Sequence, residues 1–221
     1  MVVLSLFDKT GNMVKPWAKS GYRCICVDIQ HNSGVVKKDG VEYWGVDVRK
    51  VQLPRVDYKI VFAFPQCDHL SISGARWFQS KGLRSLESAI DLVATALELI
   101  EFTRCKKWML ENPVSTLSTY WRKPDHIFHP HQYGGYQGGS GDSYTKKTCL
   151  WTSPGFVMPP PRSIDPVDGS KMHLLGPSDD RKDLRSQTPR GFSQAVYEYN
   201  NGIKQPPIKK TNNDQLELFN V

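Results

Sequence analysis

The sequence lacks any apolar run approaching the roughly 18 residues that a membrane-spanning helix requires. Met1 leads straight into an apolar segment, residues 2–7, without the charged start of a secretory signal. No Cys-x-x-Cys pair occurs among the five cysteines, and their odd number suits a reducing compartment better than a disulfide framework. No internal repeat is present either. We therefore expect a soluble, cytoplasmic protein with free thiols.

Charge is the first positive feature. The 221 residues carry a net charge of +7, and the sequence pI is about 9.1. Such a balance favours a polyanionic partner, because neutralising phosphates releases condensed counterions. A merely basic surface is the alternative, so charge alone gives weak support for nucleic acid.

The length and the 39% hydrophobic content fit one domain with a tail. Segments rich in β-branched and aromatic residues alternate with segments typical of helices, which predicts an α/β fold with a mostly parallel sheet and helices between most strands. The predicted strands are residues 2–7, 22–27, 41–46, 59–64 and 107–110, with a further short strand at 148–151.

Two helices are predicted. The clearer one covers residues 85–104, where apolar residues recur every three or four positions, at Leu86, Ile90, Val93, Leu97 and Ile100. The second covers residues 189–200, with Thr188 as its N-cap and Pro189 at its first position. Between them, residues 113–144 are rich in glycine, histidine and aromatic residues and are expected to be loop.

Ligands of open α/β sheets bind beyond the carboxyl ends of the strands. In this chain each of five predicted strands is followed, within a few residues, by a residue that could contact a ligand: Gly11, Asp28, Asp47, Cys67 and Glu111. Gly11 lets the backbone turn close to a ligand, and Asp28 is placed to accept hydrogen bonds from ribose hydroxyls. A lone Asp after a strand is more often a turn former or cap, so each element alone is weak. Together they predict one crevice.

Cys67 follows an apolar strand in a short polar loop. A thiol there can reach substrate and lie near the amino terminus of a helix, which stabilises the thiolate and lowers the thiol pKa. The alternative is a buried small hydrophobe, as most free cysteines are. Glu111, after the next strand, favours the catalytic interpretation, because attack on C6 of cytosine needs a carboxyl group at N3 to make the ring electrophilic.

These residues resemble the motifs of the cytosine-C5 DNA methyltransferase family, especially a compact bacteriophage-type branch. Residues 6–11 resemble its Phe-x-Gly-x-Gly motif, residues 65–74 its Pro-Pro-Cys-Gln segment, and residues 111–113 its Glu-Asn-Val motif. Residues 146–148 resemble the basic motif that positions the target ring, and residues 188–196 the last motif. The resemblance implies a Rossmann-like methyltransferase fold over residues 1–200 in the host cytoplasm.

The resemblance also implies site residues. S-adenosylmethionine is expected to contact Phe7, Lys9, Thr10, Gly11, Asp28, Ile29, Asp47, Val48, Phe64 and Pro65. A cytosine flipped out of DNA would be attacked by Cys67, protonated by Glu111 and positioned by Lys147. Contacts to nucleic acid are expected from Ser71, Arg76, Trp77, Arg122, Lys123 and Lys146. No metal site is expected, since the histidines of residues 125–131 have no matching cysteine pair.

Three departures from the family pattern matter. Lys9 stands where the family usually has glycine. A lysine beside the cofactor could favour a donor that carries an extra carboxylate over S-adenosylmethionine. The alternative is a lysine that points into solvent. Gln66 and Asp68 flank the cysteine where Pro and Gln are usual. Residues 153–187 leave room only for a reduced target-recognition region.

Residues 201–221 form a polar tail. It ends in Gln215, Leu216, Glu217, Leu218 and Phe219, which resembles the Gln-Leu-x-Leu-Phe peptide that docks on the bacterial replication sliding clamp. Packing of the three apolar residues on the domain is the alternative. For the whole protein, two rival hypotheses remain open: an enzyme using the same site on RNA or with a modified group, and a non-catalytic cofactor- and DNA-binding protein.

Overall fold

The computed structural model describes residues 1–138, 141–170 and 185–202. In them an eight-stranded sheet runs in the order β3-β4-β2-β1-β5-β6-β8-β7. Five strands are parallel: β1 (Val2–Leu6), β2 (Arg23–Val27), β4 (Val41–Gly45), β5 (Tyr58–Ala63) and β6 (Trp108–Pro113). β3 (Gly34–Lys38) is antiparallel to β4, and β8 (Thr148–Thr152) is antiparallel to β6 and to β7 (His126–Phe128). The predicted mostly parallel α/β fold is confirmed.

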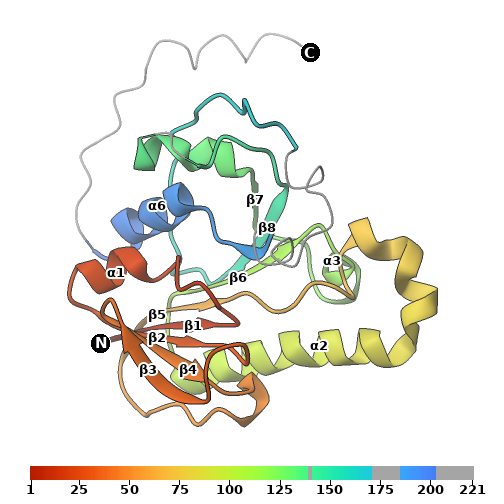
Figure 1. The fold of residues 1–221 in the computed structure, drawn as a ribbon, viewed down its shortest axis with the longest axis horizontal. Coiled ribbons are helices and arrows are strands. Elements are labelled where there is room, and N and C mark those ends of the chain that lie inside the picture. The colour runs from red at the N-terminus through yellow and green to blue at the C-terminus, as the bar shows by residue number, and fades with distance from the viewer. Residues whose placement is uncertain (139–140, 171–184, 203–221) are drawn as a thin grey trace.

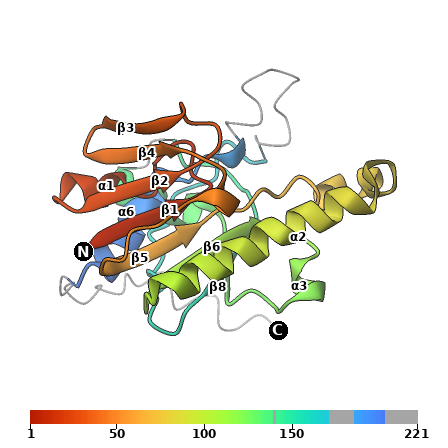
Figure 2. The same ribbon diagram turned by 90° about the horizontal axis from the view of Figure 1, so that it is seen from below.

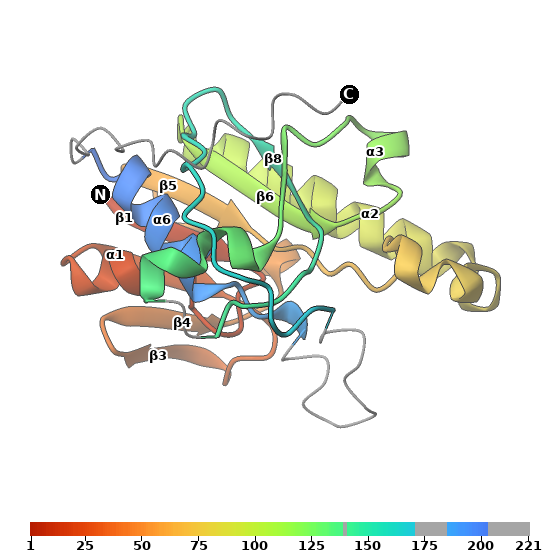
Figure 3. The same ribbon diagram turned by 90° about the horizontal axis from the view of Figure 1, so that it is seen from above.

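Helices cover both faces of the sheet (Figure 1). Alternating residues of β1 belong to two separate cores: Leu4 and Leu6 pack with α2 (Phe78–Thr103), whereas Val3 packs with α1 (Lys15–Lys19) and α6 (Arg190–Asn200). Figures 2 and 3 show α2 on one side and α1 with α6 on the other. Because strand side chains alternate between faces, a strand buried along its whole length, such as β1, requires this three-layer arrangement.

The helix α2 confirms the predicted helix and extends it toward the amino terminus, across a break at Gly82, whose φ is 75°. Its buried stripe is Ala89, Val93, Ala96 and Ile100, while Ile90 is 37% exposed. The expected stripe was therefore wrong at Ile90. The two alanines were not counted as apolar positions, yet their small side chains let the helix lie close to the sheet.

The expectation of helices between most strands was wrong. A helix connects β1 to β2 and β5 to β6, but β3 separates β2 from β4, and only the 3₁₀ turn η1 (Val48–Lys50) lies between β4 and β5. β3 and β4 form a hairpin around Asp39 and Gly40, which have φ values of 52° and 78°. Asp-Gly between strand-like runs is a strong hairpin signal, since both turn residues need positive φ.

The expectation that residues 113–144 are loop was also wrong. They include β7, the short helix α3 (Leu117–Tyr120) and the 3₁₀ segment η3 (Pro130–Gln137). Tyr133 and Tyr136 are buried, and Phe128 stacks on Phe192 of α6 with ring centroids 4.2 Å apart. Burial of this aromatic cluster under α6 outweighs the loop-forming tendency of the glycines.

The amino terminus of α6 also differs from the prediction. Pro189 occupies the N-cap position, and no side chain of the helix start makes the capping hydrogen bond expected of Thr188. Instead, the backbone N–H of Gly191 donates to Asp142 Oδ2 at 2.6 Å. A carboxylate from a distant loop thus satisfies one of the free N–H groups of this helix. Among the described helices, none combines the length and apolar character needed to cross a membrane.

Candidate active site at the carboxyl edge of the sheet

The segment after β1 turns tightly around the buried carboxylate of Asp8. Asp8 Oδ1 accepts hydrogen bonds from the backbone N–H of Gly11 at 2.7 Å and of Thr10 at 3.1 Å, and Oδ2 accepts one from Ser5 Oγ at 2.8 Å. Burial raises the pKa of Asp8, and these hydrogen bonds oppose the rise. Asp8 was not among the predicted site residues, although it holds the loop that carries Lys9, Thr10 and Gly11.

Gly11 cannot be replaced freely. Its φ is 64°, and a Cβ built on it would lie 2.6 Å from the hydroxyl oxygen of Tyr43. Tyr43 packs edge-on against His31, and His31 Nε2 lies 3.1 Å from the carbonyl oxygen of Asp8. The missing side chain therefore lets the buried Gly11 lie close against Tyr43 of β4.

The carboxylates after β2 and β4 have local partners. Asp28 is buried, and its Oδ1 accepts the backbone N–H of Gln30 at 2.8 Å. Asp47 caps η1 and pairs with the Arg49 side chain at 2.6 Å, which lowers the pKa of Asp47. Each thus forms the turn or cap that a lone aspartate after a strand commonly forms, while lying at the carboxyl edge where the crevice was predicted. Of the other predicted cofactor residues, Lys9 and Ile29 are exposed, Val48 and Pro65 are buried, and Phe7, Thr10 and Phe64 are partly exposed.

The loop containing Cys67 is joined to the loop after β6. Asn112 Nδ2 donates to the carbonyl oxygen of Pro65 at 3.2 Å. Farther along, the N–H of Thr116 donates to the Leu70 carbonyl at 3.0 Å, and the N–H of Ile72 to the Val114 carbonyl at 3.1 Å. These bonds fix the segment of Cys67 relative to the strand end that carries Glu111, so the two predicted catalytic residues are positioned as one unit.

Glu111 carries an unsatisfied group. Its Oε1 is buried and has no hydrogen-bond partner among the described residues. Burial raises the pKa of Glu111, and the ammonium of Lys146 opposes the rise. An unpartnered buried carboxyl oxygen costs free energy. A raised pKa lessens this cost, because the carboxyl group can retain its proton and act as a donor.

The pKa of Cys67 differs from the prediction. Burial, followed by the nearby carboxylates of Glu111 and Asp68, raises it to about 11. The expectation of a lowered pKa was wrong, because no regular helix begins at this loop. The 3₁₀ segment η2 (Ile72–Trp77) follows instead. Lys146 lowers the pKa of the thiol without overcoming the burial.

Lys146 and Lys147 lie in different environments. Lys146 lines a small hollow together with Phe64, Glu111, Thr148 and Thr188, whereas Lys147 is exposed. Lys146 Nζ also donates to the Arg185 carbonyl oxygen at 2.8 Å. The period-two alternation along β8 and its approach turns Lys146 and Thr148 toward the site and Lys147 away from it. Lys146, which we assigned to DNA contact, is the lysine beside Glu111.

The residues predicted to contact nucleic acid fall into two groups. Arg76 and Trp77 are exposed on η2, just after the Cys67 loop, with the guanidinium 5.1 Å from the ring centroid. Ser71 precedes them and is buried, and its hydroxyl oxygen lies 2.8 Å from the hydroxyl oxygen of Ser73. Arg122 is held by Asp125 at 2.8 Å and by the Thr152 carbonyl oxygen at 3.3 Å, and Lys123 beside it is exposed. The peptide of Gln215, Leu216, Leu218 and Phe219 lies outside the described residues.

Sequence reasoning missed Asp8, Asn112 and the contribution of Gln187 and Phe192 to the hollow beside Glu111. A signal existed for three of them. Asp8 stands three residues before Gly11, a spacing at which Asp side chains commonly bond the backbone of a turn. Asn112 is adjacent to Glu111 in the motif itself. Phe192 lies within the last motif, residues 188–196, but nothing local marks Gln187, because it reaches the hollow only through the return of the chain to α6.

The mostly parallel sheet with helices on both faces defines a Rossmann-like α/β protein. No family profile matches the chain. It is 29% identical over 170 residues, covering 71% of this chain and 73% of the relative, to a protein of Frog virus 3 (isolate Goorha) named probable DNA (cytosine-5)-methyltransferase. The resemblance that the motifs indicated is thereby confirmed.

A solved structure also aligns with the chain. It is a protein of E. coli described provisionally as a DNA modification methyltransferase encoded within a prophage. The TM-score is 0.47 at 12% identity, and the alignment covers 81% of this chain and 49% of that one. The chain thus spans about half the length of this structural relative.

Proposed function

We propose that the chain is a DNA cytosine-C5 methyltransferase that uses S-adenosylmethionine. The observation that carries the proposal is the pair formed by Cys67 and Glu111. The loop of Cys67 is hydrogen-bonded to the end of β6 that carries Glu111, and Glu111 presents a buried oxygen that has no partner within the described part of the chain. A flipped cytosine supplies what this oxygen lacks, since N3 of the ring is an acceptor for a protonated carboxyl group.

The raised pKa of Glu111 fits the role of a general acid. A carboxyl group whose pKa is raised holds its proton more readily and can donate it to N3, and the ring then accepts electrons from a nucleophile at C6. Donation also places the negative charge of Glu111 against a cationic ring rather than against the thiolate. Lys146 lowers the pKa of Cys67 and so stabilises the thiolate before attack.

The covalent sequence balances. The Cys67 thiol loses its proton and the sulfur bonds to C6, which makes C5 nucleophilic. C5 gains the methyl group, a base removes the C5 proton, the S–C6 bond breaks as the ring double bond returns, and N3 gives its proton back to Glu111. Cys67 is thereby restored. S-adenosylmethionine would supply the electrophilic methyl group on a sulfonium.

The residues of the crevice fit such a cofactor. Gly11 lets the loop after β1 turn closely where a Cβ would meet Tyr43, and the Asp28 carboxylate lies at the end of β2, where a ribose contact is expected. Lys9 is exposed on the same loop. A donor with an extra carboxylate, such as a carboxy derivative, would meet this ammonium. The mass of the product base after incubation with each donor separates the two.

DNA is the proposed partner, held by Arg76 and Trp77 beside the Cys67 loop, with Lys123 as an outer phosphate contact. We also propose residues 153–187 as a reduced target-recognition region and residues 215–219 as a sliding-clamp peptide. Clamp tethering would raise the effective concentration of DNA for a weakly selective enzyme. Deleting residues 215–221 should abolish clamp pull-down and leave activity on short DNA unchanged.

The decisive experiment is a mechanism-based trap. Wild-type protein, Cys67→Ala and Cys149→Ala are incubated with cofactor and DNA containing 5-fluorocytosine, whose C5 fluorine cannot leave as a proton does. The wild type and the Cys149→Ala control should form a denaturation-resistant adduct, and Cys67→Ala should form none. An adduct of equal yield in Cys67→Ala, or none in wild type, would contradict the proposal.

Two rivals are distinguished by the same materials. Gln66 and Asp68 depart from the family pattern, which favours a protein that binds DNA and cofactor without turnover. Such a protein would bind both and give no product. An enzyme acting on RNA would give a modified base from RNA and not from DNA, as measured by mass spectrometry of the digested nucleosides.

A further inference from the structure

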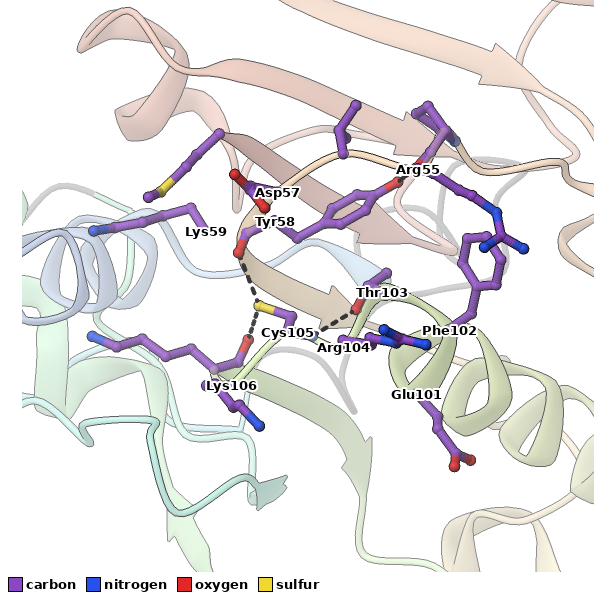
Figure 4. A pocket seen from close by; sticks show the side chains of 14 residues that line it. Arg55, Asp57, Tyr58, Lys59, Glu101, Phe102, Thr103, Arg104, Cys105 and Lys106 are labelled. Carbon is purple, nitrogen blue, oxygen red and sulfur yellow. Dashed lines mark hydrogen bonds between the residues drawn. The ribbon is translucent and has the colours of Figure 1, made fainter.

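An open groove lies at the opposite edge of the sheet from Cys67. It has a volume of about 1150 Å³ and is formed by the segments that enter β1, β5 and β6 together with the carboxyl end of α2 (Figure 4). We call it the amino-edge groove and define it by residues 54–59 and 101–107. The length of the intervening strands, five or six residues, separates it from the carboxyl edge by roughly 17–20 Å.

Positive charge gathers in the amino-edge groove. Its basic lining residues are Arg55, Lys59, Arg104, Lys106 and Lys107. Its acidic lining residues are only Asp57 and Glu101. Among the described residues, none of the five basic side chains forms an ion pair. Within the described part of the chain, the groove therefore holds five cations that are not paired with a carboxylate.

The strongest crowding involves two lysines. Lys59 acts electrostatically on Lys107, and Lys107 Nζ donates to the Asn200 carbonyl oxygen at the end of α6 at 3.2 Å. Burial lowers the pKa of Lys107, and the neighbouring Lys59 lowers it further. Like charges held close together repel, and an anion between or beside them would relieve that repulsion.

The shape of the groove indicates an extended ligand. Arg55, Arg104 and Lys106 are exposed along its rim, while Lys59, Thr103 and Cys105 lie deeper. Phe102 is 44% exposed, and the Arg55 guanidinium lies 5.5 Å from its ring centroid, which places a flat surface next to the cations. Cations along an open groove with an exposed ring match a phosphodiester backbone that runs past the protein.

We propose that the amino-edge groove binds the phosphate backbone of a second DNA segment while the carboxyl edge holds the target base. A monomer with phosphate contacts at two opposite edges bridges two segments of DNA. Such a protein can move between segments without complete release. This inference goes beyond the proposed methyl transfer and requires only that the chain bind DNA.

The test is a bridging assay with the full chain, shown to be monomeric by analytical ultracentrifugation. Immobilised duplex DNA captures a second, fluorescent duplex or single strand only if one protein molecule holds both. The groove variant is Arg55→Gln/Arg104→Gln/Lys106→Gln, whose three sites are exposed. The matched control is Lys19→Gln/Lys37→Gln/Lys38→Gln, which removes the same charge from exposed positions of α1 and β3.

Wild type and the control should bridge, and the groove variant should lose bridging about tenfold or more. For the second segment, the slope of log affinity against log salt should become shallower by about 3, at roughly 0.9 per duplex phosphate contact. Methylation of a short duplex should change less than about twofold. Equal bridging by the groove variant, equal loss in the control, or no bridging by a wild type that binds DNA would each overturn the inference. Failure to bind DNA at all would instead sink the proposed function.

Discussion

The two halves of the carboxyl edge treat a buried carboxylate in opposite ways. In the half formed by β1, Asp8 is surrounded by donors from Ser5, Thr10 and Gly11. In the half formed by β5 and β6, Glu111 leaves Oε1 without a partner among the described residues. Burial raises the pKa of both. The difference teaches that one carboxylate stabilises a loop, while the other is left for a group that the protein does not supply.

Replacing Glu111 by Gln should have the largest effect. Turnover should fall by about 10² to 10⁴, because the general acid is lost while the shape remains. The free energy of unfolding should be unchanged or higher at neutral pH, since an ionisable buried group with a raised pKa is removed. The free-energy cost of ionising the buried Glu111 carboxyl is absent at low pH and grows as pH rises above the ordinary glutamate pKa of 4.5, so the stability advantage of Gln should vanish in acid.

Both effects are checked by measuring the turnover of wild type and Glu111→Gln and their unfolding by denaturant at several pH values. A large loss of stability in Glu111→Gln would place Glu111 with Asp8 among the structural carboxylates and remove the contrast.

Replacing Asp8 by Ala should give the reverse pattern. Several buried donors lose their acceptor, so the free energy of unfolding should fall by about 2–4 kcal/mol. Binding of the cofactor should weaken because the loop of residues 8–11 loses its anchor. Calorimetric unfolding and cofactor titration measure the two effects, with the exposed Asp165→Ala as a control. Normal stability with lost binding would instead make Asp8 a direct ligand contact.

The charges around Cys67 should set its reactivity with iodoacetamide. The thiol pKa of about 11 makes alkylation rise about tenfold per pH unit between pH 7 and 10, since the thiolate reacts. Glu111→Gln should speed alkylation at fixed pH by removing a negative neighbour, and Lys146→Met should slow it by removing a positive one. Mass spectrometry of the Cys67 peptide gives the rates. Identical rates in both variants would show that neither charge reaches the thiol.

Replacing Gly11 by Ala should have the smallest effect, a loss of about 1–2 kcal/mol in stability. The new Cβ meets the Tyr43 hydroxyl, and its φ of 64° is unfavourable for alanine. Combining it with Tyr43→Phe should recover part of the loss, because the oxygen nearest the Cβ is then absent. Thermal unfolding of the two single variants and the double variant measures the coupling. Strict additivity would leave only backbone strain as the cause.

Some elements of the fold could be predicted from the sequence and others could not. The apolar strands after Met1 and before Cys67 were predictable because both faces of each are buried, which leaves an unbroken apolar run. The hairpin strand β3 was missed, since its residues are exposed and carry no core pattern. The aromatic and glycine-rich segment around Tyr133 was taken for loop, because nothing local shows that α6 would cover it.

The sequence by itself determined the order of the chemical groups: a glycine turn, two aspartates, a cysteine and a glutamate, each after a strand. Parallel pairing must bring such groups to one edge, so their proximity followed from the strand pattern. Only the tertiary structure decided the neighbours, pKa values and hydrogen-bond partners of these groups. Burial and the return of residues 142–148 set which lysine faces Glu111, why the Cys67 pKa is raised, and which carboxylate keeps an unpartnered oxygen. Those properties depend on neighbours distant in the chain, which no local pattern encodes.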